Sequence, residues 1–301
     1  MRKHNKLIKR TKGEMIFEIC NYVFLASLTL VFVLPFLTVL STSFVSSEEA
    51  ARRGSFILLP NKIDFSAYKI LLAKGSLIWN GYKITLFRVV VGTTLNLTAT
   101  SMLAYGLSKK KLPGRNAIIG LIFITMIFTG GLVPTYLLIN SLGLVNSIWV
   151  LVLHMLINPW WLIIMKNFFA QIPDSIEESA SMDGASAFTI LFRIILPLST
   201  PILATIGLFY AVWHWNSWFD AAIYITENTK WPVQIIMRNI VLSMSNSDLN
   251  QEVMSDLLGA PPPPVTIRSA LIVITTIPIL MVYPFLQKHF VKGIIIGSVK
   301  G

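Results

Sequence analysis

Histidine and carboxylate side chains, which most often carry out catalysis or hold metals, are scattered thinly along this sequence. The histidines are His4, His154, His214 and His289, and none has a cysteine or carboxylate at the spacing of a metal site. All 14 carboxylates fall in polar segments or near the ends of apolar runs, whereas an ion-coupled carrier commonly keeps one at mid-membrane. The sequence therefore predicts no catalytic residues and no metal site.

A nucleotide site is not expected either, because the sequence contains no glycine-rich G-x-x-x-x-G-K-[ST] loop to hold phosphates. Any ATP must therefore be bound by another protein. With a single cysteine, Cys20, the chain forms neither an internal disulfide nor a cysteine metal cluster. We therefore expect no cofactor in this chain.

A polar segment, residues 173–197, carries the signals of a short helix. Ser175 and Glu178 form a capping-box pattern that predicts a helix start after the helix breaker Pro173. Gly184 can adopt the left-handed conformation that ends a helix. We expect a helix of about two turns that lies along the membrane surface.

Two interpretations of this short helix are open. Residues 179–181 are small enough for another protein to approach the backbone, and Ile176 and Met182 would supply apolar anchors in a groove. Alternatively, the segment is only an interfacial connector between apolar runs. In either case, Pro197 predicts a kink at the entry into the next apolar run.

The elements around this segment are apolar runs of a length that crosses a bilayer. Hydrophobic residues make up 54% of the 301 residues and charged residues only 13%, whereas soluble domains carry about 25% charged residues. Six runs approach the roughly 20 residues that a spanning helix needs: 16–40, 84–107, 117–139, 148–169, 194–218 and 270–290. We therefore expect an all-α polytopic membrane protein with six transmembrane helices.

Lysine and arginine residues beside the apolar runs predict which loops face the cytoplasm. They cluster in segments 2–12 and 109–115 and recur in the tail, which places both termini in the cytoplasm. The net charge of +11 comes largely from these lysine and arginine residues, so we interpret it as a sign of membrane orientation and not of a nucleic-acid partner. Segments 41–83, 140–146 and 219–267 would lie outside. The first is predicted to be structured, and the prolines at 261–264 are predicted to form a stiff spacer.

The polar segment also resembles a family signature. Glu178-Ser179-Ala180, Asp183-Gly184-Ala185 and Ile194-Ile195-Leu196-Pro197 resemble the E-A-A, D-G-A and I-x-L-P pattern of permease subunits of binding-protein-dependent ABC importers, with serine in place of the first alanine. The resemblance assigns ATPase coupling to the following residues: Glu177, Glu178, Ser179, Ala180, Asp183, Gly184, Ala185 and Pro197.

The resemblance extends along nearly the whole chain, to the maltose-type carbohydrate permeases. It is carried by P-T-Y-L at 134–137 with G-L-V-N at 143–146, N-F-F at 167–169 with I-P at 172–173, and W-N-S-W at 215–218. The stretch Y-P-F-L-Q-K-H-F-V-K-G at 283–293, with G-S-V-K-G at 297–301, is similar to the complex-polysaccharide branch, which includes permeases for uronic-acid oligosaccharides.

The resemblance implies a type I ABC importer permease fold with a cytoplasmic coupling helix. Residues 1–15 would be a basic cytoplasmic N-terminus, 16–290 the six-span permease domain with its coupling loop at 173–197, and 291–301 a cytoplasmic tail. Whether the tail also contacts the ATPases or is only a disordered basic end is open.

The resemblance also implies partners in the bacterial cytoplasmic membrane. These are a second homologous permease subunit, two ATP-binding cassette ATPases that bind ATP and Mg²⁺, and an extracellular solute-binding protein that delivers a sugar or oligosaccharide. The chain would be a multi-pass transport subunit, not an enzyme, and would form half of the translocation pathway. Closure of the ATPases would move residues 178–184 and switch the pathway between inward-facing and outward-facing states.

Aromatic and amide side chains are the candidates for lining the substrate pathway. The main group, near the outer end of the fifth run, is Trp213, Trp215, Asn216 and Trp218. An aromatic face suits the C–H side of a pyranose and an amide binds hydroxyls, but an interfacial aromatic belt is the alternative. Further candidates are Tyr136, Asn96, Asn158 and Arg88. For Arg88, contact with an acidic sugar and snorkelling outward are both open, and we prefer snorkelling.

Two other function classes make different demands on the sequence. A stand-alone channel or carrier would move solute without any ATPase, and for an ion-coupled carrier we would expect a mid-membrane carboxylate. A membrane enzyme acting on lipid or peptide would need a convergent nucleophile and base. The residues supply neither feature, so both classes rank below the importer subunit.

Overall fold

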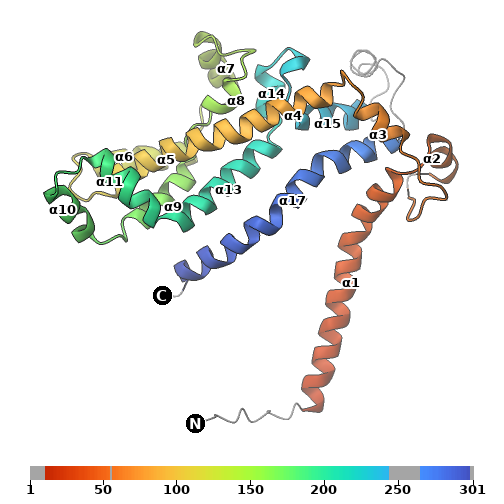
Figure 1. Ribbon diagram of the computed structural model, residues 1–301, viewed down its shortest axis with the longest axis horizontal. Helices are drawn as coiled ribbons and strands as arrows, with labels where there is room; N and C mark the ends of the chain where they lie inside the picture. Colours follow the sequence, from red (N-terminus) through yellow and green to blue (C-terminus); the bar gives the residue numbers. More distant parts are fainter. Residues whose placement is uncertain (1–10, 55, 244–264, 299–301) are drawn as a thin grey trace. The chain divides into compact units, whose positions relative to one another are not determined.

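The computed structural model describes the backbone of residues 11–54, 56–243 and 265–298. Throughout these ranges the regular elements are helices, with no strand (Figure 1), which confirms the all-α class. The described residues divide into two units, one drawn from Met1–Leu71 with Pro263–Val273 and the other from Leu72–Pro262 with Ile274–Gly301. The basic segment 2–10 and the predicted proline spacer at 261–264 lie outside the described residues.

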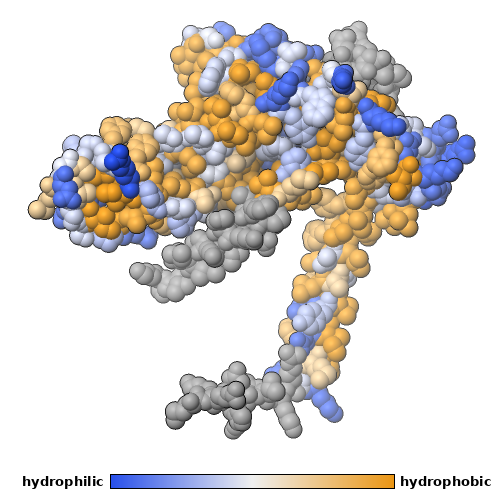
Figure 2. Space-filling view, in the orientation of Figure 1, coloured by the Kyte–Doolittle hydropathy of each residue, from blue (hydrophilic) through white to orange (hydrophobic). Residues whose placement is uncertain are grey.

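The first unit begins with one long apolar helix, α1 (Lys12–Thr42). Its N-terminus is closed by a capping box, in which the Thr11 hydroxyl accepts from the Glu14 N–H and the Glu14 carboxylate accepts from the Thr11 N–H. Large apolar side chains are exposed from Met15 to Leu40, and Figure 2 shows the hydrophobic surface that they form. At 31 residues, α1 is long enough to cross a hydrocarbon core.

The loop after α1 is structured, as predicted for segment 41–83. It contains α2 (Ser47–Arg53) and α3 (Ser66–Leu71). The Ser43 hydroxyl lies 2.8 Å from the Tyr68 hydroxyl, so the start of the loop is tied to α3. Within the loop, a small cluster of buried side chains packs together: Val45, Ala50 and Ile57.

The second unit is organised around a continuous helix from Leu77 to Ser108. It consists of α4 (Leu77–Phe87), the π-helical turn η1 (Arg88–Gly92) and α5 (Thr93–Ser108). α5 packs against α9 (Pro159–Phe169) and α13 (Thr200–Asn216). The buried core of this bundle comprises Ala104, Leu107, Leu162, Met165, Phe169, Ile190, Leu191, Ile195, Ile206 and Tyr210.

Other apolar helices of this unit are bent or interrupted. The chain bends by 117° between α6 (Arg115–Ile127) and α7 (Leu132–Ser141), and by 88° between the segment Ala187–Leu198 and α13. That segment comprises α11 (Ala187–Ile190), the π-helical turn η2 (Leu191–Ile195) and α12 (Leu196–Leu198).

The predicted six spans are therefore not confirmed as such. The described residues contain three helices long and apolar enough to cross a membrane, or up to five if each bent pair is one span. The predicted fourth span, 148–169, is divided into α8 (Val150–Leu153) and α9. The physical reason is a helix start inside the apolar run: Asn158 caps α9 and Pro159 occupies its first turn.

The remaining elements of the second unit follow α13. They are α14 (Phe219–Tyr224), the short 3₁₀ turn η3 (Asn228–Lys230) and α15 (Val233–Ser243). Buried side chains of α7, α8, α14 and α15 form a second cluster: Ile139, Val150, Leu151, Ala221, Tyr224, Ile225 and Ile235. The last helix, α17 (Val265–Ser298), is divided between the units at Val273, contains the predicted sixth span and continues into the predicted tail.

Candidate functional site

The predicted short helix is α10 (Asp174–Met182), which lies at one end of the second unit, at the left of Figure 1. The predicted capping box is wrong. Pro173 is the N-cap residue and no side chain caps the helix, so Ser175 is the second helical residue. Its hydroxyl therefore sits too far into the helix to cap it. Asp174 and Glu177 place negative charge in the first turn, where the helix dipole favours it.

The C-terminal end of α10 is as predicted. Gly184 has φ +82°, in the left-handed region. Its N–H donates to the Ser181 carbonyl at 3.0 Å, and the Ala185 N–H donates to the Ala180 carbonyl at 3.0 Å. These two bonds make a Schellman motif, which fixes the direction in which the chain leaves the helix.

The two faces of α10 have different surroundings. Ile176, Glu177 and Ala180 are partly buried, and Ala180 packs against the bundle core with Ala185 beyond the helix end. On the opposite face, Glu178 and Ser179 are exposed. Met182 is 89% exposed, and Asp183 and Gly184 are also exposed. One face is thus anchored to this chain, and the other is open to a partner.

The kink predicted at Pro197 is present two residues later. α12 ends at Leu198 and α13 begins at Thr200 at an angle of 88°. Pro197 and Pro201 flank the bend, and each removes one backbone donor from the helical hydrogen-bond pattern. The chain from α10 therefore reaches α13 through a sharp corner.

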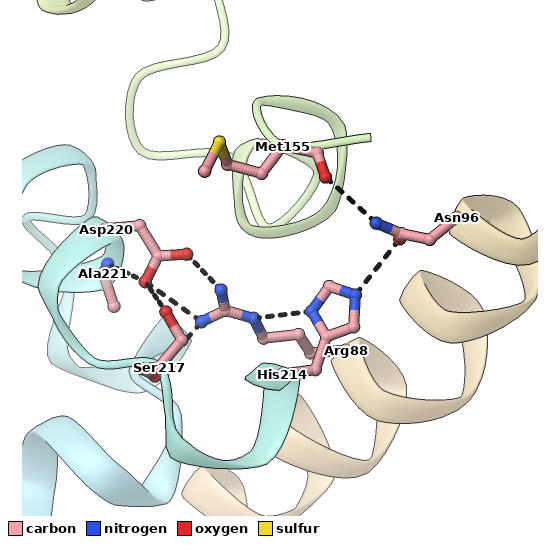
Figure 3. Close-up of polar contacts among 7 residues, drawn as sticks. All are labelled: Arg88, Asn96, Met155, His214, Ser217, Asp220 and Ala221. Carbon is pink, nitrogen blue, oxygen red and sulfur yellow. Dashed lines mark hydrogen bonds and ion pairs between the residues drawn. The ribbon is translucent and has the colours of Figure 1, made fainter. Parts of the chain in front are cut away.

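A buried ion pair lies in another part of the same unit (Figure 3). The Arg88 guanidinium, on η1, pairs with the carboxylate of Asp220, on α14, through both of its terminal nitrogens. The Arg88 side chain is fully buried, and that of Asp220 is 4% exposed. Asp220 also accepts from the Ser217 hydroxyl at 3.0 Å and the Ala221 N–H at 2.9 Å. A buried pair of this kind is tolerated because all its polar atoms find partners.

Hydrogen bonds continue from this pair through α13 and α5 to the segment between α8 and α9 (Figure 3). Arg88 Nε donates to His214 Nδ1 at 3.2 Å. Because a guanidinium can only donate, Nδ1 must accept, so His214 is neutral with its proton on Nε2. Nε2 lies 3.2 Å from Asn96 Oδ1, and the Asn96 amide donates to the Met155 carbonyl at 3.0 Å. Each hydrogen bond of this network is therefore donated toward the next residue, from Arg88 on η1 to the Met155 carbonyl in the non-helical segment between α8 and α9.

A glycine makes room for this network. A Cβ atom on Gly92 would lie 2.4 Å from His214 Nε2, which is inside van der Waals contact. Gly92 ends the π-helical turn that begins at Arg88, and such turns occur often at functional sites. The absence of a side chain at Gly92 therefore leaves the space that the His214 imidazole occupies in the network.

The structure corrects the expectation for Arg88, which does not snorkel outward. The reason is Asp220, which supplies an opposite charge inside the unit and so removes the need to reach solvent. Sequence reasoning missed Asp220 as a partner, because it treated carboxylates near run ends as loop residues. The sequence signal that pointed to this pair was an arginine inside the second apolar run together with an aspartate just after the fifth.

The other pathway candidates are spread over several environments. Trp213 lies beside the network, with Arg88 Cζ 5.4 Å from its ring centroid. Trp215 is buried near Tyr82, and Arg238 Cζ lies over the Trp218 ring, 4.0 Å from its centroid. The Asn216 amide donates to the Val212 carbonyl of its own helix. The structure thus gathers Arg88, Asn96 and Trp213, and their role toward substrate stays a prediction.

Asn158 caps α9 and contacts α13, and Tyr136 contacts α14. Asn158 Oδ1 accepts from the Trp160 and Trp161 N–H groups, which caps α9. The Asn158 N–H donates to the Tyr210 hydroxyl at 3.0 Å. Tyr136 stacks on Tyr224 of α14 with ring centroids 6.0 Å apart.

A polar contact joins two segments that are predicted to lie outside the membrane. Asn146, at φ 59°, donates to the Glu227 carboxylate at 2.6 Å and accepts from the Glu227 N–H at 3.2 Å. Lys230 Nζ donates to the Asn146 carbonyl at 3.0 Å. The hydrogen bonds from Lys230 and Asn146 hold the pKa of the Glu227 carboxyl below its usual range. This contact keeps the two segments together.

Metal ligands are not gathered anywhere in the part of the chain that the structure describes. There, no group of three or more His, Cys, Asp or Glu side chains is placed to hold an ion. His154 and His214 belong to different contacts: His154 packs against the Tyr224 ring, while His214 is held by the Arg88 network. The geometry of the described residues is that of a helical scaffold that carries the exposed polar helix α10 at one end of the second unit.

Comparison with known proteins identifies the family. No family model matches the chain. It is 44% identical to the polygalacturonan/rhamnogalacturonan transport system permease protein YtcP of Bacillus subtilis, over 95% of this chain and 99% of the relative. It is also 44% identical to protein LplC of the same organism, over 97% of each chain.

A solved structure agrees with these relatives. A chain from the crystal structure of a bacterial ABC transporter involved in the import of the acidic polysaccharide alginate matches with a TM-score of 0.83 and 34% identity, over 94% of this chain and 99% of that one. The expected family is thereby confirmed. The chain belongs to the ABC sugar transport permeases: it is a permease subunit, not an enzyme, of an ABC importer for a sugar or oligosaccharide in the bacterial cell membrane.

Proposed function

We propose that this subunit forms half of the translocation pathway and couples to cytoplasmic ATPases through α10, around residues 178–184. The observation that carries this proposal is the two-faced geometry of α10. One face packs on the bundle, while Glu178, Ser179 and Met182 are exposed on the other. An exposed short helix with an acidic side chain and an apolar anchor suits insertion into a groove of a partner protein.

The proposed assembly contains a second homologous permease subunit, two ATPase subunits and an extracellular solute-binding protein. ATP and Mg²⁺ are bound by the ATPases, since the sequence has no phosphate-binding loop. Both termini and α10 face the cytoplasm in this arrangement, and the chain crosses the membrane six times. The bent pairs and the interrupted α8–α9 segment each count as one span, because irregular backbone is tolerated where it lines a cavity.

The substrate that we propose is an acidic oligosaccharide. Two relatives support it: one is named as a permease for polygalacturonan and rhamnogalacturonan, and the other belongs to an importer of the acidic polysaccharide alginate. Trp213, Trp215, Asn216 and Trp218 remain the candidate contacts. Oligogalacturonides and neutral oligosaccharides of equal length should be compared as cargo of the reconstituted importer. Import of only the neutral sugars would contradict the acidic class.

The coupling role is tested by changing the exposed face and the end of α10 in the assembled importer. Glu178→Gln removes the exposed charge, and Gly184→Ala forces a Cβ into the left-handed region at φ +82°. We expect both variants to retain less ATPase subunit on purification and to lose transport-coupled ATP hydrolysis. Glu48→Gln, an exposed carboxylate on α2, is the control. Unchanged ATPase retention and unchanged coupled hydrolysis in both variants would show that α10 does not dock.

A further inference from the structure

The two consecutive glutamates of α10 have different environments. Successive residues of a helix point about 100° apart. The Glu178 side chain is exposed, whereas the Glu177 side chain is 17% exposed and pairs with Lys109. The family resemblance placed both residues in one ATPase-coupling group. Their side chains are directed to different surroundings, so the group divides into two.

Both carboxylate oxygens of Glu177 are held by the C-terminal end of α5. Lys109 Nζ forms an ion pair with Oε1, and the Tyr105 hydroxyl donates to Oε2 at 3.2 Å. Lys109 Nζ also lies 4.3 Å from the centroid of the Tyr105 ring. Lys109 is the C-cap residue of α5, where the helix dipole favours a cation. We call Tyr105, Lys109 and Glu177 the latch.

The latch lies in a groove between α10 and the bundle. The groove has a volume of about 440 Å³ and is lined by residues of α5, α10 and α11, including Met102 and Phe188, and by Ala185 in the turn between α10 and α11. Ala180 and Ala185 pack against the bundle core on the same side of α10. Apolar packing alone allows such a helix to slide, whereas a paired carboxylate at one point fixes its register on α5.

We propose that Glu177 is a positioning residue that locks α10 onto the end of α5, so that force applied to α10 reaches α5 directly. This inference rests on the proposed docking of ATPases on α10. It adds a second route of transmission beside the covalent route through α11, η2 and α12 to α13. The direct route matters because α5 also carries Asn96, whose amide holds the Met155 carbonyl between α8 and α9.

The test measures coupling separately from docking in the complete importer. Glu177→Gln and Lys109→Met each remove one charge of the latch. We expect both variants to retain the ATPase subunits on purification. The amount of sugar imported per ATP hydrolysed should fall by up to about fivefold, the factor that corresponds to a partly exposed ion pair. Unchanged coupling in both variants would overturn the proposal.

Two controls separate the latch from a general effect of charge. Glu227 and Lys230 form an ion pair in a segment predicted to lie outside, with 3.0 Å between Nζ and Oε2 and with side chains that are 52% and 34% exposed. Glu227→Gln and Lys230→Met should leave the coupling ratio unchanged. A loss of coupling equal to that of the latch variants would contradict a specific role for Glu177.

A covalent link tests whether positioning is the function of the latch. In a Cys20→Ser background, which removes the only native cysteine, Lys109→Cys and Glu177→Cys are combined and joined by a short bifunctional thiol reagent. The linked protein should couple normally, and the same double variant without the reagent should not. If linking fails to restore coupling, the latch does not act by holding α10 on α5.

The docking proposal and the latch fail in different ways. If Glu178→Gln releases the ATPases while Glu177→Gln changes nothing, docking on α10 stands and the latch proposal falls. If Glu178→Gln and Gly184→Ala leave both retention and coupling intact, docking on α10 falls. The two results are therefore distinguishable in one set of purified importers.

Discussion

The Arg88–Asp220 pair and the latch pair Lys109–Glu177 both join distant segments, but their environments differ. The partners are 132 residues apart in the first pair and 68 in the second. The side chains of Arg88 and Asp220 are 0% and 4% exposed, whereas those of Lys109 and Glu177 are 31% and 17% exposed. Breaking a fully buried pair leaves an unsolvated charge, while water can replace a partly exposed partner. The first pair should thus govern stability, and the second should govern the placement of one helix.

Removing one partner of the buried pair is the largest expected effect. Asp220→Leu leaves the Arg88 guanidinium buried without its counter-charge, which costs about 3–5 kcal/mol of unfolding free energy. Thermal unfolding of the purified protein in detergent measures the loss. The double variant Arg88→Met with Asp220→Leu removes both charges and should recover part of it. A double variant less stable than Asp220→Leu would show that the pair is not a unit.

Filling the space beside His214 should have a smaller effect. The Cβ atom of Gly92→Ala would lie 2.4 Å from His214 Nε2, so the imidazole must shift away from residue 92, which disturbs its hydrogen bond to Asn96. We expect a loss of about 1–3 kcal/mol, as for overpacking of a core. Gly120→Ala, where no atom lies within 4 Å of the added Cβ, is the control and should be neutral or slightly stabilising. Equal behaviour of the two variants would mean that the network tolerates displacement of His214.

The latch pair should give the smallest change in stability. Glu177→Gln and Lys109→Met each expose polar atoms that water can solvate, so unfolding free energy should fall by at most about 1 kcal/mol. The same thermal unfolding assay checks this. A loss as large as that of Asp220→Leu would erase the distinction between the two pairs.

The class of the protein and the end of α10 could be predicted from sequence, because each depends on local signals. Apolar runs need only composition, and Gly184 needs only its backbone freedom at one position. The start of α10 was mispredicted because the capping-box pattern at Ser175 competes with Pro173, and the proline determines where the helix begins. A local pattern does not say which of two adjacent start signals prevails.

The contacts between distant residues could not be predicted in the same way. The Arg88 network joins positions on five different segments, and no periodicity brings Arg88 to Asp220. The interruption of the fourth apolar run was readable in principle, since Asn158 followed by Pro159 is a helix-start signal. Hydropathy averages over such a signal and therefore predicts one span. The different surroundings of Glu177 and Glu178 also needed the packed structure.

The corner between α12 and α13 has a mechanical consequence. Two helical segments that meet at 88° behave as an elbow. A push along the axis of the first segment has almost no component along the second, so it acts as a sideways force on the near end of α13. Such a joint converts a thrust along the first segment into a sideways displacement of α13. The far end of α13 carries Trp213, His214 and Trp215.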